Sequence, residues 1–204
     1  MKRRIKHVTV LGSGIMGSGI AAHFANIGVE VLLLDIVPFE LTETEQKKGL
    51  TKEDKAVRNR IAAENFEKLK KASPALLYSP KFAERITVGN FDDDLKKIKN
   101  TDWIIEVVVE RLDIKKSVYE KIEQFRKPGT LVSSNTSGIP IHFLIEGRSE
   151  DFKKHFAGTH FFNPVRYLPL LEVIPTPETD PEIAKFYMEF GAKFLGKTTV
   201  LAKD

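Results

Sequence analysis

Short apolar runs alternate with helical periodicities along this chain, and the alternation predicts an α/β domain. The apolar runs that predict β-strands are residues 7–11, 30–35, 86–88, 103–109, 130–133, 156–160, 170–174 and 198–201. The helical patterns lie between them, at residues 20–26, 51–73, 113–125, 140–145 and 181–195. A strand, a helix and a second strand in close succession require a right-handed crossover and parallel strands. We therefore expect one doubly wound α/β domain over residues 1–204, with a mostly parallel sheet.

The longest helical pattern, at residues 51–73, is amphipathic and basic. Thr51 with Asp54 predicts a capping box at its start. Residues 47–71 contain nine Lys or Arg and four Asp or Glu, so this segment carries +5 while the whole chain carries +4. A local basic face favours a partner that bears phosphate, and a solvated helix face is the alternative. Nucleic acid is disfavoured as a partner, because acids interrupt the bases and Phe66 is the one aromatic residue available for stacking.

Composition limits the classes of protein that this chain can belong to. It is 42% hydrophobic and 29% charged over 204 residues, which is typical of a soluble globular domain. No stretch approaches the ~20 uncharged apolar residues that span a bilayer, so we expect no membrane partner. The basic N-terminus leads into a strand pattern and not into a signal peptide. The absence of Cys excludes disulfides, thiolate catalysis and zinc–thiolate sites, and it fits a reducing cytoplasm.

A glycine-rich turn follows the first apolar run, with Gly12, Gly14 and Gly17 in the pattern G-x-G-x-x-G. Gly12 permits a tight turn, Gly14 lets a pyrophosphate approach the backbone, and Gly17 lets the next helix pack against the sheet. The pattern predicts a dinucleotide site because it follows a strand and opens a helix, whose N-terminus attracts phosphate. Asp35 ends the second strand 23 residues after Gly12, where a carboxylate binds ribose hydroxyls and repels a 2′-phosphate. These residues predict NAD in preference to NADP, and the alternative is a chance glycine turn.

Polar groups also follow two later strands. Glu106 and Glu110 fall on the same side of the fourth apolar run, and Glu110 lies where we expect this strand to leave the sheet. Ligands bind at the carboxyl ends of parallel strands in such folds, which makes Glu110 a candidate ligand-binding residue. The alternative is that both acids are structural and pair with Arg111 or Lys115. The run Ser133–Ser137 offers small hydrogen-bonding groups after the next strand, and a capping turn is its alternative explanation.

A third constellation joins His160 with Glu172, which lies inside the apolar run 170–174. A carboxylate among apolar residues is costly unless it is paired, and a histidine is a natural partner. In such a pair His160 is the candidate general base, and Glu172 holds the imidazole in one tautomer. A purely structural pair, or no contact at all, is the alternative. No cluster of His, Asp and Glu has the spacing of metal ligands, so we expect no metal.

Five motifs occur in one order and together resemble the cofactor domain of the 3-hydroxyacyl-CoA dehydrogenases, enzymes of fatty-acid β-oxidation. They are the glycine turn, Asp35, IEVVVE at 105–110, SNTS at 134–137, and HFFNP at 160–164 with LEVI at 171–174. The match extends over nearly the whole chain. The resemblance implies a Rossmann-type fold in which residues 51–73 are a helical insertion after the second strand. The basic residues of that insertion would then face the phosphates of coenzyme A.

The resemblance also implies a reaction and the residues that perform it. The reaction is NAD-dependent oxidation of 3-hydroxyacyl-CoA to 3-oxoacyl-CoA, with an acyl-CoA as the partner. Ser137 would hydrogen-bond the C3 oxygen of the substrate, His160 would take the hydroxyl proton as hydride leaves C3, and Glu172 would steady the imidazolium. The residues implied in NAD binding are Gly12, Gly14, Gly17, Asp35, Glu110 and Lys115.

The chain departs from the family pattern at Gly138, Arg111 and 167–169, and these departures concern acyl-chain preference more than chemistry. The family continues into an all-helical domain that closes the substrate cleft and usually forms a homodimer. We therefore expect such a domain after Asp204, with this chain as the cofactor-binding half of a cytoplasmic enzyme that turns over acyl-CoA poorly alone. Two alternatives stay open: a dehydrogenase of a small hydroxy acid, and a catalytically silent dinucleotide-binding or structural relative.

Overall fold

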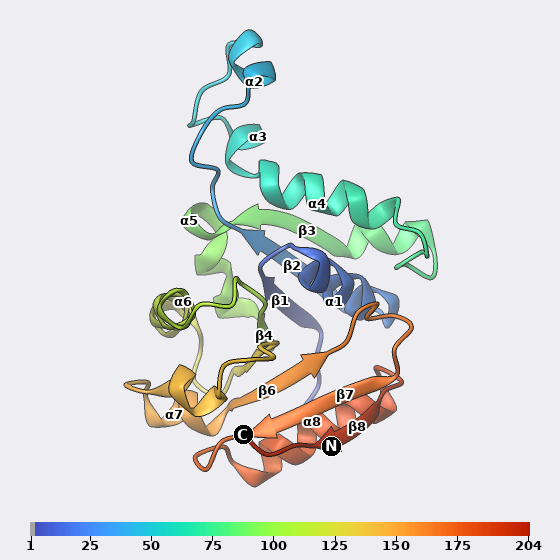
Figure 1. The fold of residues 1–204 in the computed structure, drawn as a ribbon, viewed down its shortest axis with the longest axis vertical. Helices are drawn as coiled ribbons and strands as arrows, with labels where there is room; N and C mark the ends of the chain where they lie inside the picture. The colour runs from blue at the N-terminus through green and yellow to red at the C-terminus, as the bar shows by residue number, and fades with distance from the viewer. Residues whose placement is uncertain (1–2) are drawn as a thin grey trace.

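One sheet of eight strands runs through the computed structural model, which describes residues 3–204. The strands are β1 (His7–Leu11), β2 (Glu30–Asp35), β3 (Ile86–Asn90), β4 (Trp103–Glu106), β5 (Leu131–Ser134), β6 (Phe156–Phe161), β7 (Leu170–Pro175) and β8 (Thr198–Leu201). Their order in the sheet is β3-β2-β1-β4-β5-β6-β7-β8, and every neighbouring pair is parallel except β6 with β7 (Figure 1). The expected mostly parallel sheet is confirmed.

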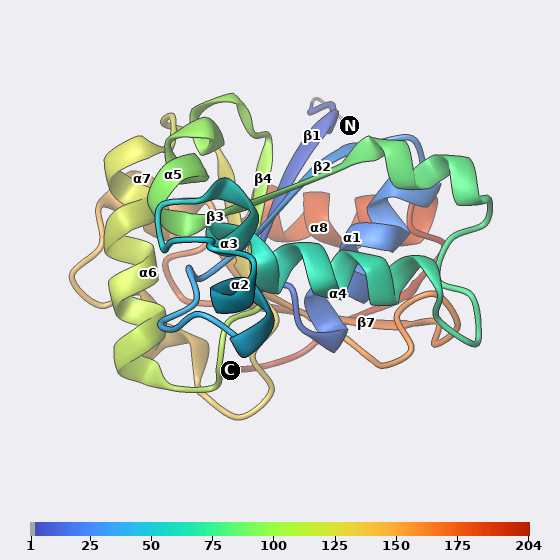
Figure 2. The same cartoon turned by 90° about the horizontal axis from the view of Figure 1, so that it is seen from above.

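Helices cover both faces of this sheet, as a doubly wound fold requires (Figure 2). The helices on one face are α1 (Ile15–Asn26), α4 (Arg60–Lys70) and α8 (Pro181–Lys193), and the long helix on the other is α6 (Leu112–Phe125). The remaining helical segments are short: α2 (Glu43–Lys47), α3 (Lys55–Arg58), η1 (Pro80–Arg85), α5 (Phe91–Asp94), η2 (Leu95–Asn100), η3 (Ile141–Ile145) and α7 (Glu150–Lys154). Within residues 3–204 no helix is both long enough and apolar enough to cross a membrane.

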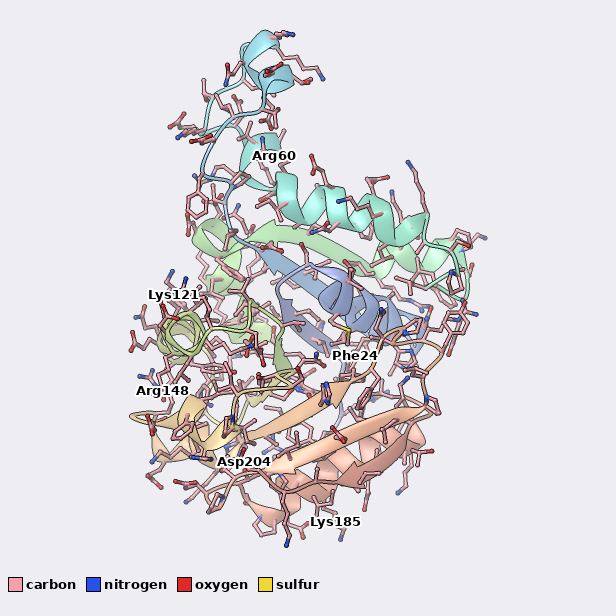
Figure 3. The ribbon with its side chains drawn as sticks, in the orientation of Figure 1. Phe24, Arg60, Lys121, Arg148, Lys185 and Asp204 are labelled. Carbon is pink, nitrogen blue, oxygen red and sulfur yellow. The ribbon has the colours of Figure 1, made fainter. Side chains whose placement is uncertain are left out.

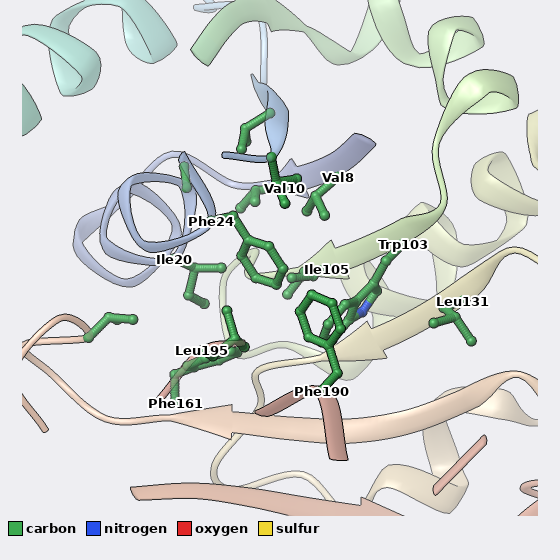
Figure 4. Packing of buried hydrophobic residues seen from close by; sticks show 14 of the residues in the cluster. Val8, Val10, Ile20, Phe24, Trp103, Ile105, Leu131, Phe161, Phe190 and Leu195 are labelled. Carbon is green, nitrogen blue, oxygen red and sulfur yellow. The ribbon is translucent and has the colours of Figure 1, made fainter. Parts of the chain in front are cut away.

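The larger apolar cluster of the core is built around Trp103 of β4. Its indole is fully buried, and the ring centroids of Tyr187, Phe24 and Phe190 lie 4.9, 5.2 and 5.8 Å from it. These rings join β4 to α1 and α8 (Figure 4). The indole N–H donates to the Ser133 hydroxyl of β5 at 2.9 Å, so the one polar atom of the ring is satisfied. This packing holds α1, and with it the glycine turn, at a defined position on the sheet.

Most expected strands and helices begin and end within two residues of their observed bounds. Outside the insertion after β2, the exceptions are the start of α1 and the end of β4. Helix α1 begins at Ile15, earlier than expected, because only Gly12 of the turn needs a positive φ, of 106°, and the helix starts directly after Gly14. Strand β4 ends at Glu106, three residues before the apolar run does. The Glu106 carboxylate accepts a hydrogen bond from the N–H of Val108 at 2.8 Å, which turns the chain out of the sheet.

The expected single helix over residues 51–73 is wrong, because the structure has two helices there, α3 and α4. The insertion between β2 and β3 also contains α2 before them and η1 after them. Helices α3 and α4 are separated at Asn59, whose side-chain oxygen accepts a hydrogen bond from Asn90 at 2.6 Å. The expected capping box is only half formed. The Asp54 carboxylate accepts a hydrogen bond from the N–H of Thr51 at 2.6 Å, but Asp54 itself is the N-cap of α3 and no side chain caps that helix.

A complete capping box occurs earlier, at the start of α2, where Thr42 and Glu45 exchange hydrogen bonds between side chain and backbone. The Glu45 carboxylate also forms an ion pair with Arg60, which donates a second hydrogen bond to the carbonyl of Glu40 at 2.8 Å. Arg60 thus ties α2 to the start of α4 (Figure 3). The insertion stands out from one edge of the sheet, with α2 at its far end (Figure 1).

Candidate functional site

Four polar segments meet at the carboxyl end of the sheet. Strands β1, β2, β4 and β5 are parallel, so the residues that follow them leave the sheet at the same end, the carboxyl end of these strands. The sheet also has a switch point between β1 and β4, because the chain moves outward from β1 through β2 to β3 and then returns to the other side. Ligands of open α/β sheets bind at such a switch point. The segments there are the glycine turn after β1, Asp35 at the end of β2, Glu110 after β4 and Ser134–Ser137, which begins with the last residue of β5.

The glycine turn has the geometry expected of a phosphate cradle. A Cβ atom on Gly12 would lie 2.5 Å from the carbonyl oxygen of Val107, and one on Gly17 would lie 1.8 Å from that of Gly12. Neither position therefore has room for a side chain. A Cβ atom on Gly14 would meet no atom within 4 Å, so the backbone there is open to a ligand. Gly14 is also the N-cap of α1, where no side chain caps the helix, and such an N-terminus suits a pyrophosphate.

Asp35 is oriented by its neighbours at the end of β2. One carboxylate oxygen, Oδ2, accepts hydrogen bonds from the backbone N–H of Ser13 at 2.6 Å and from the Ser13 hydroxyl. The other, Oδ1, accepts the N–H of Ile36 at 2.8 Å. Since a carboxylate has about four lone-pair sites, one site on Oδ1 stays open for a ribose hydroxyl. The glycine turn and Asp35 together fit the phosphates and the ribose of NAD.

Glu106 is fully buried, and its carboxylate is surrounded by donors. The four donors are the Lys115 ammonium at 2.7 Å, the Val108 N–H at 2.8 Å, and the Tyr119 and Ser134 hydroxyls, each at 2.7 Å. A buried carboxylate is stable only when hydrogen bonds and a counter-charge compensate for lost hydration. The structural explanation left open for Glu106 is therefore correct, with Lys115 and not Arg111 as its partner.

Glu110 holds the loop that carries Ser137. Its Oε1 atom accepts hydrogen bonds from the Thr136 hydroxyl and from the N–H groups of Ser137 at 3.1 Å and Gly138 at 3.0 Å. Its Oε2 atom lies 3.2 Å from the ammonium of Lys115, whose side chain is 1% exposed beneath it. Burial alone would raise the pKa of Glu110, but the Thr136 and Gly138 hydrogen bonds and the Lys115 charge lower it to about 2. Glu110 is therefore ionised at neutral pH, beside an exposed Ser137.

The register of the antiparallel strands β6 and β7 brings His160 and Glu172 together. The two residues are directly opposite in the ladder, and Nδ1 of His160 lies 2.8 Å from Oε2 of Glu172. Because the carboxylate accepts, Nδ1 carries the hydrogen and Nε2 keeps its lone pair. The imidazole also packs against Phe162, with 4.4 Å between ring centroids, and its side chain is 18% exposed. The alternative of no contact is wrong, and the pair forms.

The histidine pair and the Ser137 loop are joined at the end of β6. Ser134 is opposite Gly158 in the parallel ladder between β5 and β6. His160 therefore lies two residues after Gly158 along β6, just past the end of that ladder. The next residue, Phe161, donates its N–H to the side-chain oxygen of Asn135 at 2.9 Å. Asn135 thus connects the loop after β5 to the strand that carries His160.

Sequence reasoning missed Ser13 and Asn65. Asn65 of α4 donates to the Ser13 hydroxyl at 2.9 Å, and Ser13 donates to Asp35. The place of Ser13 between two glycines next to the second strand was a usable signal. Nothing in the sequence indicated Asn65, because its contact depends on how α4 packs beside α1. In the described part of the chain, no three His, Asp or Glu side chains are grouped so that they could hold a metal ion.

Comparison with known proteins adds an independent line of evidence. Residues 7–204 match the family model described as 3-hydroxyacyl-CoA dehydrogenase, NAD binding domain. All of the chain is 58% identical to a probable 3-hydroxyacyl-CoA dehydrogenase of Bacillus subtilis, of which it covers 26%. Over 98% of its length it is 48% identical to one of Deinococcus radiodurans, of which it covers 54%. The solved 3-hydroxybutyryl-CoA dehydrogenase of Escherichia coli is similar at a TM-score of 0.76 and 26% identity, over 98% of this chain and 39% of that one.

The chain therefore spans about a quarter of the length of the Bacillus subtilis relative and about half of the length of the Deinococcus radiodurans relative.

The buried pair of Glu106 and Lys115 generates a prediction about stability. We expect Lys115→Met to lower the free energy of unfolding by about 3–5 kcal/mol, because it leaves the Glu106 carboxylate buried without a counter-charge. Arg111→Met is the matched control, because Arg111 pairs with Asp113 where both side chains are 66% exposed, and we expect a change of at most about 1 kcal/mol. Urea unfolding measures both values. Equal losses in the two variants would contradict the role given to Lys115.

The lowered pKa of Glu110 generates a prediction about pH. A carboxyl whose folded-state pKa is about 2, against an ordinary value of 4.5, stabilises the fold above pH 4.5. That contribution is lost as the pH falls from 4.5 towards 2. We expect the stability difference between the wild type and Glu110→Gln to be constant near pH 7 and to shrink below pH 4.5. Thermal unfolding at a series of pH values measures it, and a difference that stays constant down to pH 3 would refute the prediction.

Proposed function

Because this chain belongs to the NAD-binding domain family of the 3-hydroxyacyl-CoA dehydrogenases, we propose that it serves the NAD-dependent oxidation of 3-hydroxyacyl-CoA to 3-oxoacyl-CoA in cytoplasmic fatty-acid β-oxidation. The observation that supports this most is the pair of His160 and Glu172, whose Nδ1 and Oε2 atoms are 2.8 Å apart. The pair lies at the same end of the sheet as the glycine turn. Oxidation of an alcohol needs a base for the hydroxyl proton and an acceptor for the hydride. An imidazole of fixed tautomer supplies the base, and NAD held at the glycine turn, at the same end of the sheet, would supply the hydride acceptor.

In the proposed reaction His160 is the general base. Its Nε2 atom accepts the proton of the C3 hydroxyl, while Glu172 keeps the hydrogen on Nδ1 and stabilises the imidazolium that forms. NAD, when bound, supplies the acceptor for the hydride that leaves C3. The Ser137 hydroxyl donates a hydrogen bond to the C3 oxygen as it becomes a carbonyl. Glu110 positions Ser137 by accepting its backbone N–H.

The proposed cofactor contacts follow the two sides of the switch point. Gly12, Gly14 and Gly17 receive the diphosphate at the N-terminus of α1. Asp35 ends β2, on one side of β1, so we assign it to the adenosine ribose. Glu110 follows β4, on the other side, so we assign it to the nicotinamide half, with Lys115 acting beneath it.

The insertion supports coenzyme A as the carrier of the substrate. Four lysines on and between α2 and α3 are exposed, and they are Lys47, Lys48, Lys52 and Lys55. Coenzyme A bears phosphate groups, which such a surface attracts, whereas a free hydroxy acid would make no use of it.

We further propose that turnover requires a second, all-helical domain in addition to residues 1–204, and that the complete protein is a homodimer through that domain. Support comes from the resemblance and from the length of the relatives, of which this chain covers 26% and 54%.

The proposed function is tested with the chain alone and with a chimaera that joins it to the residues following the matched region of the Deinococcus radiodurans relative. Fluorescence titration follows NADH binding, and NADH oxidation follows reduction of acetoacetyl-CoA or free acetoacetate. We expect both proteins to bind NADH, and the chimaera to reduce the thioester far faster than the chain alone does. A chimaera that binds NADH but uses acetoacetate as well as acetoacetyl-CoA would contradict the proposed substrate class.

The role of His160 generates a separate prediction in that chimaera. We expect His160→Ala to lower kcat for acetoacetyl-CoA reduction by about 10²–10⁴-fold, the usual loss for a general base, with little change in NADH affinity. Glu172→Gln should lower kcat less, because the imidazole loses its orienting carboxylate but keeps Nε2. His7→Ala is the matched control, since the His7 side chain is 55% exposed, and it should retain the wild-type kcat. An undiminished kcat in His160→Ala would remove the assignment of the base.

A further inference from the structure

Asn65, Ser13 and Asp35 form a chain of hydrogen bonds that links the insertion to the glycine turn. The side-chain Nδ2 atom of Asn65, in α4, donates to the Ser13 hydroxyl at 2.9 Å. That hydroxyl donates in turn to Oδ2 of Asp35, which also accepts the backbone N–H of Ser13. The glycine pattern leaves the position of Ser13 open to any residue, and none of the five motifs contains Asn65.

The chemistry of the three groups fixes the direction of these bonds. An ionised carboxylate only accepts, so the single hydroxyl proton of Ser13 goes to Asp35, and the hydroxyl oxygen is left to accept from Asn65. The orientation of the amide agrees with this, because its oxygen faces the ammonium of Lys68 at 3.4 Å. Successive hydrogen bonds polarise one another, so the bond from Asn65 strengthens the bond from Ser13 to Asp35.

Ser13, in the middle of this chain of hydrogen bonds, and the helix that carries Asn65 are both held in place. Ser13 is fully buried. Helix α4 is fixed where it begins, because Asn90 donates to Asn59 at 2.6 Å, and Arg58 just before it donates twice to Asp93, at 2.7 and 2.8 Å. Asn65 therefore projects from a helix whose position is determined by the edge of the sheet.

The result is a carboxylate with one open side. Ser13 occupies both lone-pair sites of Oδ2, and the N–H of Ile36 occupies one site of Oδ1, so a ribose hydroxyl can bind only at the remaining site of Oδ1. A carboxylate free to rotate would lose that freedom when a dinucleotide binds. An oriented one avoids this loss, and it keeps its negative charge where a 2′-phosphate would have to lie.

We propose that Asn65 and Ser13 are positioning residues that aim Asp35 at the adenosine ribose, and that they thereby set the preference for NAD over NADP. This inference rests on the proposed role of Asp35 in binding the ribose. It extends cofactor recognition to a residue of the insertion, outside the glycine turn and the second strand.

The test compares NADH and NADPH binding by fluorescence titration in the wild type, Asn65→Ala and Ser13→Ala. We expect Ser13→Ala to bind NADH about tenfold more weakly, the usual effect of losing one hydrogen bond to a charged group. Asn65→Ala should weaken NADH binding less, by about two- to tenfold, because Asn65 donates to a neutral hydroxyl. Affinity for NADPH should not fall, so the preference for NADH decreases. Glu64→Ala is the matched control, because Glu64 is exposed on the same helix, and it should bind both dinucleotides as the wild type does.

A double variant distinguishes a shared route from two separate effects. Asn65→Ala acts only through the hydroxyl of Ser13, so the Asn65→Ala/Ser13→Ala protein should bind NADH as weakly as Ser13→Ala alone. Thermal unfolding checks that each variant keeps its fold. If Ser13→Ala does not fold, the test rests on Asn65→Ala and on the ratio of its affinities for NADH and NADPH.

Three results would overturn the inference: wild-type NADH affinity in Asn65→Ala, equal weakening of NADH and NADPH, or additive losses in the double variant. A wild type that binds no NADH would instead overturn the proposed function, so the two failures are distinguishable.

Discussion

A buried carboxylate and its counter-charge organise the carboxyl end of this sheet. Glu106 ends β4 in the core, where it needs hydrogen bonds, and its donors come from the turn after β4, from α6 and from β5. Lys115, the charged donor, also reaches Glu110, and Glu110 in turn holds the backbone of the Ser137 loop. One electrostatic requirement thus joins a strand end, a helix and a loop. The position of the proposed oxygen-binding group depends on an acid that has no contact with solvent.

The proposed base and the proposed cofactor residues depend on two different kinds of strand end. Asp35 ends a parallel strand, whereas the glycine turn and Glu110 follow parallel strands in loops that hydrogen bonds must hold. His160 and Glu172 lie within an antiparallel pair, where the ladder itself sets them opposite each other. The single antiparallel pair in the sheet therefore gives the base and its orienting acid a fixed separation. Asn135 connects the two arrangements by bonding to the backbone of Phe161.

In the insertion, the helix that the local sequence pattern predicts differs from the helices that tertiary packing produces. The sequence predicts one helix over residues 51–73, because helical periodicity continues across Asn59. In the structure Asn59 bonds to Asn90, and the helix divides there. Helix α4 packs against α1, which lets Asn65 reach the turn, while the lysines of α2 and α3 remain exposed. Helical periodicity records which side of a segment is apolar, and it carries no information about a hydrogen bond to a distant strand.

The amino-acid sequence by itself determined the order of the strands and of the long helices α1, α6 and α8, because the burial of each strand and the demands of a glycine turn are local properties. It also singled out His160 and Glu172, since an acid in an apolar run must have a partner. Only the tertiary structure decided which partner each acid has: Lys115 and not Arg111 for Glu106, and Ser13 with Asn65 behind it for Asp35. These choices depend on distances between segments far apart in the chain, which packing sets and local patterns do not encode.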